Sequence, residues 1–142
     1  MKRIFIVAAV GLFLGICGFF LLAVIGMRGE PFQTTIGTAN VDWLPPSSKN
    51  VSQMKRDGFG AMEYVECTIP EADFVMLAEK KKWPIKEEVD VLSPLGIPAL
   101  FNADAPVIRR AFKTESYAAN GRGYGVVYDR DAQRMYYNWN SR

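Results

Sequence analysis

The chain contains no histidine and only two cysteines. The absence of histidine excludes Ser-His-Asp and Cys-His catalysis and argues against most zinc and copper sites. Because Cys17 lies in an apolar run and Cys67 lies far beyond it, the part of the chain after that run cannot form an internal disulfide. A domain of this kind depends on its apolar core for stability.

Charge is absent from Ile4 to Met27, directly after Lys2 and Arg3. At a rise of about 1.5 Å per residue, a helix over this run is long enough to cross a bilayer core of about 30 Å. The positive-inside rule then predicts a cytoplasmic N-terminus, so the following residues would lie in a periplasm, lumen or extracellular space. We therefore expect a transmembrane signal anchor at residues 1–27, with the membrane as a partner.

Two alternatives for this run stay open, and both also export the C-terminal part. A cleaved signal peptide has a shorter apolar region and a small-residue cleavage site, which Val24-Ile25-Gly26 matches poorly. A lipoprotein needs a small residue before Cys17, where this chain has Ile16. If the run is a membrane helix, the GxxxG pair of Gly11 and Gly15 favours packing against another membrane helix.

The excess of positive charge is confined to the N-terminus. Of 17 basic and 15 acidic residues, Lys2 and Arg3 account for the difference, so the rest of the chain is neutral. This balance argues against nucleic acid as a partner. Residues 28–50 are expected to be a linker and docking segment, because Pro45-Pro46 cannot continue a helix or a central strand, and Trp43 would dock it onto the core.

Residues 51–142 predict a small extracytoplasmic domain. Alternating apolar and polar residues indicate an antiparallel sheet of about five strands. The candidate segments are 51–56, 59–68, 85–92, 107–112, 124–128 and 134–139. Asp57-Gly58 predicts a hairpin turn, and the polar segment Lys113–Gly123 is expected to be mobile or to contact a partner.

One helix is expected between the second and third of these segments. Thr68-Ile69-Pro70-Glu71 fits a capping box, and the apolar stripe of Phe74, Leu77 and Ala78 would face the core. Lysines 80–82 match the negative end of the helix dipole. The predicted fold class is therefore α+β: an N-terminal transmembrane helix followed by a small antiparallel sheet of about five strands with one packed helix.

Several short motifs spread over residues 40–139 resemble those of small membrane-anchored or exported bacterial proteins of unknown function. They are Trp43-Leu44-Pro45-Pro46, Asn50-Val51-Ser52, Glu63-Tyr64, Ile69–Phe74, Tyr128-Asp129-Arg130 and Tyr136-Tyr137. The resemblance implies a bacterial, extracytoplasmic protein. It implies no activity and no functional residues.

Four groups of residues are candidates for catalysis or for binding an ion or phosphate. Gly121–Gly125 superficially resembles a phosphate loop, but it precedes a strand, so turn and strand-entry glycines explain it better. Asp129 and Asp131 are calcium-ligand candidates without the rest of a calcium loop, and a charged turn is favoured. Glu63 and Glu66, three apart on a strand, point to opposite faces. Lastly, Ser47-Ser48-Lys49 offers a serine–lysine dyad, but a proline-flanked loop cannot desolvate the lysine.

An aromatic group near the C-terminus is the remaining candidate. It comprises Tyr124, Tyr128, Tyr136, Tyr137 and Trp139. Alternation divides these rings between the two faces of a hairpin, so they either stabilise the hairpin by cross-strand pairing or form an exposed protein- or sugar-binding surface. Pairing is the favoured interpretation.

The sequence assigns no catalytic, cofactor-binding or metal-ligating residue, and no cofactor. The leading hypothesis is a single-pass, membrane-anchored protein with a non-enzymatic binding or scaffolding role beside an envelope protein partner. The alternatives are a carboxylate-dependent envelope enzyme using Glu63 or Asp129, and a membrane-anchored immunity or inhibitor protein.

Overall fold

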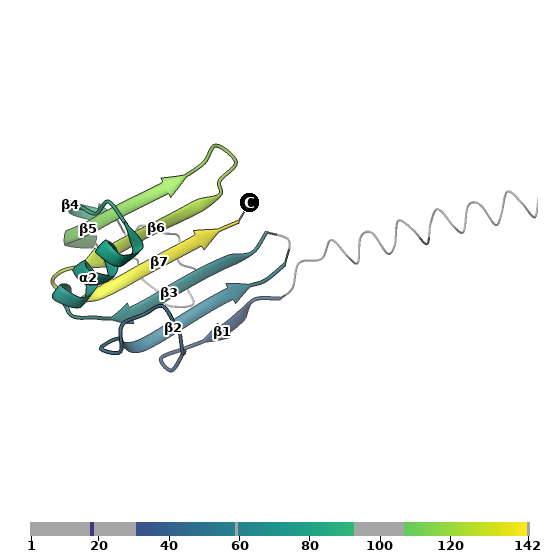
Figure 1. The fold of residues 1–142 in the computed structure, drawn as a ribbon, viewed down its shortest axis with the longest axis horizontal. Coiled ribbons are helices and arrows are strands. Elements are labelled where there is room, and N and C mark those ends of the chain that lie inside the picture. Colours follow the sequence, from purple (N-terminus) through teal and green to yellow (C-terminus); the bar gives the residue numbers. More distant parts are fainter. Residues whose placement is uncertain (1–17, 19–30, 59, 93–106, 142) are drawn as a thin grey trace, which may run out of the picture.

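A seven-stranded antiparallel sheet dominates the protein (Figure 1). The computed structural model describes residues 18, 31–58, 60–92 and 107–141. The elements are β1 (Gln33–Thr35), β2 (Lys49–Arg56), β3 (Met62–Thr68), α2 (Glu71–Lys81), β4 (Lys86–Leu92), β5 (Val107–Tyr117), β6 (Gly123–Asp129) and β7 (Arg134–Asn140). Across the sheet the strands run in the order β1-β2-β3-β7-β6-β5-β4, so the C-terminal strand lies in the centre.

The fold class predicted from the sequence is therefore wrong. The described residues form mostly a seven-stranded sheet with one short helix, not five strands behind a transmembrane helix. Among them, no helix has the length and apolarity needed to cross a membrane, so the expected transmembrane helix and signal anchor are corrected as well. Apart from Gly18, the uncharged run at residues 4–27 lies outside the described residues, as do Gly11 and Gly15.

Two parts of the sheet depart from the local prediction. The strand β1 lies within the segment expected to be a linker, and it pairs with β2 from Gln33 opposite Lys55 to Thr35 opposite Gln53. All three of its residues are exposed, so no alternation of apolar and polar residues predicted this strand. The strand β5 continues to Tyr117, into the polar segment expected to be mobile, because β6 pairs with it as far as Gly123.

The helix α2 lies on one face of the sheet, near the ends of β5, β6 and β7 (Figure 1). Its buried residues are the predicted stripe of Phe74, Leu77 and Ala78. Phe74 stacks on Tyr128 of β6, with ring centroids 4.3 Å apart and planes 10° apart. The Tyr128 hydroxyl donates to the Ile69 carbonyl at 2.9 Å, so this buried phenol ties β6 to the start of the helix.

The predicted capping box does not form. Pro70 occupies the N-cap position of α2 without a side-chain hydrogen bond to the helix. The Glu71 carboxylate instead accepts two hydrogen bonds from the Arg130 guanidinium, at 2.7 and 3.0 Å. A bidentate arginine–carboxylate pair is stronger than a capping contact, which explains why Glu71 turns toward Arg130.

A second apolar cluster lies outside the one around α2. It contains Val91, Ile108, Ala111, Val127 and Tyr136. Val127 and Tyr136 are cross-strand partners on β6 and β7, on the face of the sheet opposite Tyr128 and Tyr137. Both faces of the central strands are therefore buried.

Candidate aromatic binding site

A hollow of about 330 Å³ opens on the helix side of the sheet, beyond the C-terminal end of α2. We call it the aromatic hollow. Its lining consists of Trp43, Glu63, Lys81, Trp83, Tyr124, Tyr137 and Trp139. Five of these side chains are aromatic, and they include all 3 tryptophans of the chain. The volume lies at the low end of small-ligand sites.

The sheet supplies four of the lining residues through its register. Glu63 of β3 is opposite Trp139 of β7, which is opposite Tyr124 of β6. Directly opposed side chains share a face, so these three form a row across neighbouring strands. Tyr137 lies two residues from Trp139 on the same strand and therefore on the same face.

The end of α2 supplies Trp83 and Lys81. Lys82 adopts the left-handed conformation with φ of 57°. Its N–H donates to the Glu79 carbonyl at 3.0 Å, and the Trp83 N–H donates to the Ala78 carbonyl at 2.9 Å. This pair of bonds is a Schellman motif, which stops the helix and turns the chain. Trp83, only 9% exposed, is thereby fixed in the lining of the hollow.

Trp43 comes from the loop before β2. A turn places the Leu44 N–H 3.0 Å from the Val41 carbonyl. The loop is held to the sheet by the Ala39 N–H, which donates to the Val51 carbonyl at 2.8 Å. Trp43 and Leu44 pack against the main core, as the sequence predicts.

The rings pack against one another in two ways. The planes of Trp83 and Tyr137 differ by 25°, with centroids 5.8 Å apart, and Tyr124 is tilted by 32° from Trp83 at 6.2 Å. The Trp43 ring is nearly perpendicular to Trp83 at 84°, and it meets Tyr137 edge-on at 4.9 Å. Such edge-to-face contacts are favourable and hold the Trp43 ring against Trp83 and Tyr137.

Two groups of opposite charge border these rings. The Gln53 side-chain amide donates to Glu63 at 2.8 Å and so orients the carboxylate. The Lys81 ammonium lies 5.0 Å from the Trp43 ring centroid, a cation–π distance. Burial, and then the charge of Glu63, raise the pKa of Tyr137, so this phenol stays protonated.

The aromatic group named in the sequence analysis is divided between this hollow and the core. Tyr124, Tyr137 and Trp139 line the hollow, whereas Tyr128 and Tyr136 are buried in the two apolar clusters. The favoured interpretation from the sequence was cross-strand pairing, and the exposed binding surface was the alternative. The sequence did not indicate three residues of the lining, because they come from segments far from the hairpin: Trp43, Lys81 and Trp83. The only local signal is that each of the two tryptophans stands in or beside a turn.

Glu66 lies on the opposite face from Glu63, as the alternation predicts, so the two carboxylates do not converge. Glu66 is 2% exposed and forms an ion pair with Arg134. Burial raises the pKa of Glu66, and the Arg134 charge opposes this effect. The pair links buried Glu66 of β3 to half-exposed Arg134 of β7, and the two strands are also paired at Thr68 and Arg134.

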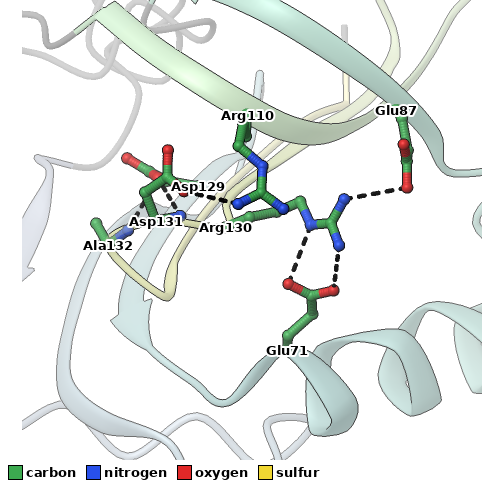
Figure 2. Close-up of polar contacts among 7 residues, drawn as sticks. All are labelled: Glu71, Glu87, Arg110, Asp129, Arg130, Asp131 and Ala132. Atoms are coloured by element: carbon green, nitrogen blue, oxygen red, sulfur yellow. Dashed lines mark hydrogen bonds and ion pairs between the residues drawn. The ribbon is translucent and has the colours of Figure 1, made fainter.

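The carboxylates of Asp129 and Asp131 are engaged within the protein (Figure 2). Asp129 accepts hydrogen bonds from the Asp131 and Ala132 N–H groups at 2.9 and 3.0 Å, and Asp131 is paired with Arg110 at 3.3 Å. In the part of the chain that the structure describes, no three histidine, cysteine, aspartate or glutamate residues are placed to hold a metal ion. The turn is a charged hairpin connection.

The other two sequence candidates are also structural. The segment before Tyr124 is a turn, in which the Gly121 N–H donates to the Ala118 carbonyl at 2.8 Å, followed by β6 and not by a helix. Lys49 is exposed at the start of β2, so it is not desolvated beside Ser48. Neither group has the geometry of its proposed chemistry.

Comparisons with protein-family models, curated proteins and solved structures give no match to this chain. The geometry of the aromatic hollow therefore carries the functional argument by itself.

Proposed function

We propose that this protein is a non-enzymatic binding domain of the cell envelope, and that the aromatic hollow holds its ligand or partner. The observation that carries the proposal is the gathering of five aromatic rings around a hollow of about 330 Å³. Phe74 and Tyr128 stack on each other within the core. The hollow rings also contact one another, but together they border an open volume. A concave, mostly aromatic surface with few polar groups is typical of a ligand site.

The polar groups of the hollow support binding over catalysis. Glu63 is the carboxylate of the hollow, whereas Asp129 lies at the far end of β6, where backbone N–H groups hold it. Glycoside hydrolysis in most enzyme families needs two carboxyl groups flanking one scissile bond. Glu63 and Asp129, the alternative carboxylates named from the sequence for an enzyme, thus do not share a site.

The placement at the envelope is supported by sequence alone. The supporting features are the uncharged run at residues 4–27, the basic residues before it and the resemblance of residues 40–139 to exported bacterial proteins. An envelope protein or an envelope polymer would be the natural ligand in that compartment.

Retention of envelope material tests the proposal. The immobilised full chain is incubated with the envelope fraction of the cells that produce it, and bound protein and carbohydrate are quantified. We expect a defined component to bind the wild type and to be lost when Trp139 and Tyr124 are both replaced by alanine. Truncating aromatic anchors removes most of the binding energy in sites of this kind.

Tyr117→Ala is the matched control, because it removes an exposed ring from the other face of the sheet. Circular dichroism checks that every variant retains its fold. Equal retention by wild type, control and double variant, or no retention by any of them, would contradict the proposed function.

A further inference from the structure

Building on the proposed function, we infer that the ligand of the aromatic hollow is a neutral saccharide, held by ring stacking and by hydrogen bonds to Glu63 and Lys81. The inference comes from three properties of the hollow: the orientation of its rings, the balance of its charges and its size.

The rings of the hollow lie at different orientations. Trp83 stacks on Tyr137 at an angle of 25° and is tilted by 32° from Tyr124, while Trp43 is nearly perpendicular to Trp83. An aromatic face carries partial negative charge and attracts polarised C–H groups. A pyranose ring presents such C–H groups on its faces and hydroxyl groups at its edge, so its face suits an aromatic side chain of the lining and its edge suits Glu63 and Lys81.

The charges at the rim select against an ionic ligand. Glu63 and Lys81 contribute one negative and one positive charge, so the hollow is neutral as a whole. An anion would meet the Glu63 carboxylate, and a cation would meet the Lys81 ammonium, which already lies 5.0 Å from the Trp43 ring centroid. A carboxylate accepts hydrogen bonds and an ammonium donates them, and a sugar hydroxyl needs both kinds of partner.

The size of the hollow favours a short sugar segment over an extended peptide. A volume of about 330 Å³ is that of a small-molecule site. Proline-rich peptides also bind aromatic grooves, but they lie in elongated grooves over several residues. A proline-rich peptide is therefore the competing outcome of the test.

Intrinsic tryptophan fluorescence reports on the hollow directly, because all 3 tryptophans of the chain line it. The full-length protein is titrated with neutral oligomers of β-linked glucose, N-acetylglucosamine and mannose. A proline-rich decapeptide, choline and a uronic-acid oligosaccharide are titrated in parallel. We expect a saturable change in emission with at least one neutral oligomer and none with the other three probes.

Three substitutions sharpen the result. Trp139→Ala is expected to weaken binding by about tenfold or more, the loss typical of an aromatic anchor. Glu63→Gln leaves a net positive hollow and is expected to add measurable binding of the uronic-acid oligosaccharide. Tyr117→Ala, on the other face, is expected to leave both affinities unchanged, and circular dichroism verifies the fold of each variant.

The outcomes separate this inference from the proposed function. Saturation by the peptide or by choline alone would overturn the saccharide assignment while leaving a binding function in place. No response to any probe, together with hollow-dependent retention of an envelope protein, would also overturn it. If no probe changes the emission, and the wild type and the hollow variants retain envelope material equally, the proposed function itself is contradicted.

Discussion

At the residue scale, Lys82 determines where Trp83 lies. A lysine in the left-handed conformation costs about 1–2 kcal/mol relative to the right-handed one, and the molecule tolerates this cost to form the Schellman motif. The motif turns the chain at the end of α2 and delivers the Trp83 ring to the hollow. Glycine is the residue usually found at such a position.

Replacing Lys82 by glycine is therefore expected to stabilise the protein by about 1 kcal/mol, because glycine adopts this conformation without the steric cost. Urea unfolding followed by circular dichroism measures the change. Lys80→Gly is the matched control inside the same helix, where glycine should destabilise by about 1 kcal/mol. Destabilisation by both substitutions would show that the helix end is not held as described.

The thiol of Cys67 is unreactive because it is buried. Cys67 is 1% exposed, and burial raises its pKa to about 12, so almost no thiolate exists near neutral pH. In a Cys17→Ser background, we expect no labelling by a disulfide-forming reagent in the native protein and full labelling in denaturant. Rapid labelling of the native protein would contradict the burial of β3.

At the element scale, Arg130 joins the β6–β7 turn to three other elements, and Figure 2 shows its contacts with two of them, α2 and β4. Its guanidinium binds Glu71 of α2 in a bidentate manner and Glu87 of β4 at 3.1 Å. The same group lies 4.6 Å from the Phe112 ring centroid of β5. Arg130 thus fixes α2 on the sheet and, through it, the helix end that supplies Trp83 and Lys81.

This contact makes stability depend on pH. Hydrogen bonds from Arg130 lower the pKa of Glu71 below its ordinary value of 4.5. A lowered pKa in the folded state contributes stability above the ordinary pKa, and that contribution is lost as the pH falls through the lowered value. We expect Glu71→Gln to flatten the fall in unfolding free energy below pH 4.5, measured by urea unfolding across that range.

Asp73→Asn is the control for that series, because it removes the same charge from the same turn of α2 and leaves the Arg130 pair intact. The control is expected to keep the acid-side fall that Glu71→Gln reduces. Identical pH profiles for the two variants would assign the effect to the helix dipole and not to Arg130.

The β5–β6 hairpin depends on Gly123, which precedes Tyr124 of the hollow. A Cβ atom at Gly123 would lie 1.9 Å from the Ser116 carbonyl oxygen, so the strands could not approach. We expect Gly123→Ala to cost about 3 kcal/mol of unfolding free energy in urea. Gly121→Ala, where a Cβ meets no atom within 4 Å, should cost only the conformational strain of about 1 kcal/mol; equal losses would contradict this hairpin geometry.

At the scale of the whole molecule, the sequence predicts elements better than their assembly. The helix stripe of Phe74, Leu77 and Ala78 and the terminal hairpin follow from local periodicity, and both are confirmed. The strand β1 is missed, because three exposed residues carry no pattern. The capping box fails because Arg130, 59 residues from Glu71 along the chain, competes for the carboxylate.

The aromatic hollow, too, could be predicted from the sequence only where its residues are near one another in the chain. Tyr124, Tyr137 and Trp139 were recognisable as one group because they lie on neighbouring strands of a hairpin. Trp43 and Trp83 join them only because β7 lies in the centre of the sheet and the helix end and the N-terminal loop both reach the same corner. That arrangement depends on non-local packing, which periodicity does not encode.

The most direct test of the binding site is the ¹⁹F NMR spectrum of the full-length protein labelled with fluorotryptophan. Its 3 tryptophans give one resonance each, and every one of them lines the hollow. If the hollow is the binding site, adding solubilised envelope material shifts or broadens all of these resonances, and Tyr124→Ala abolishes the effect. Unperturbed resonances under conditions where the envelope component is bound would contradict the account.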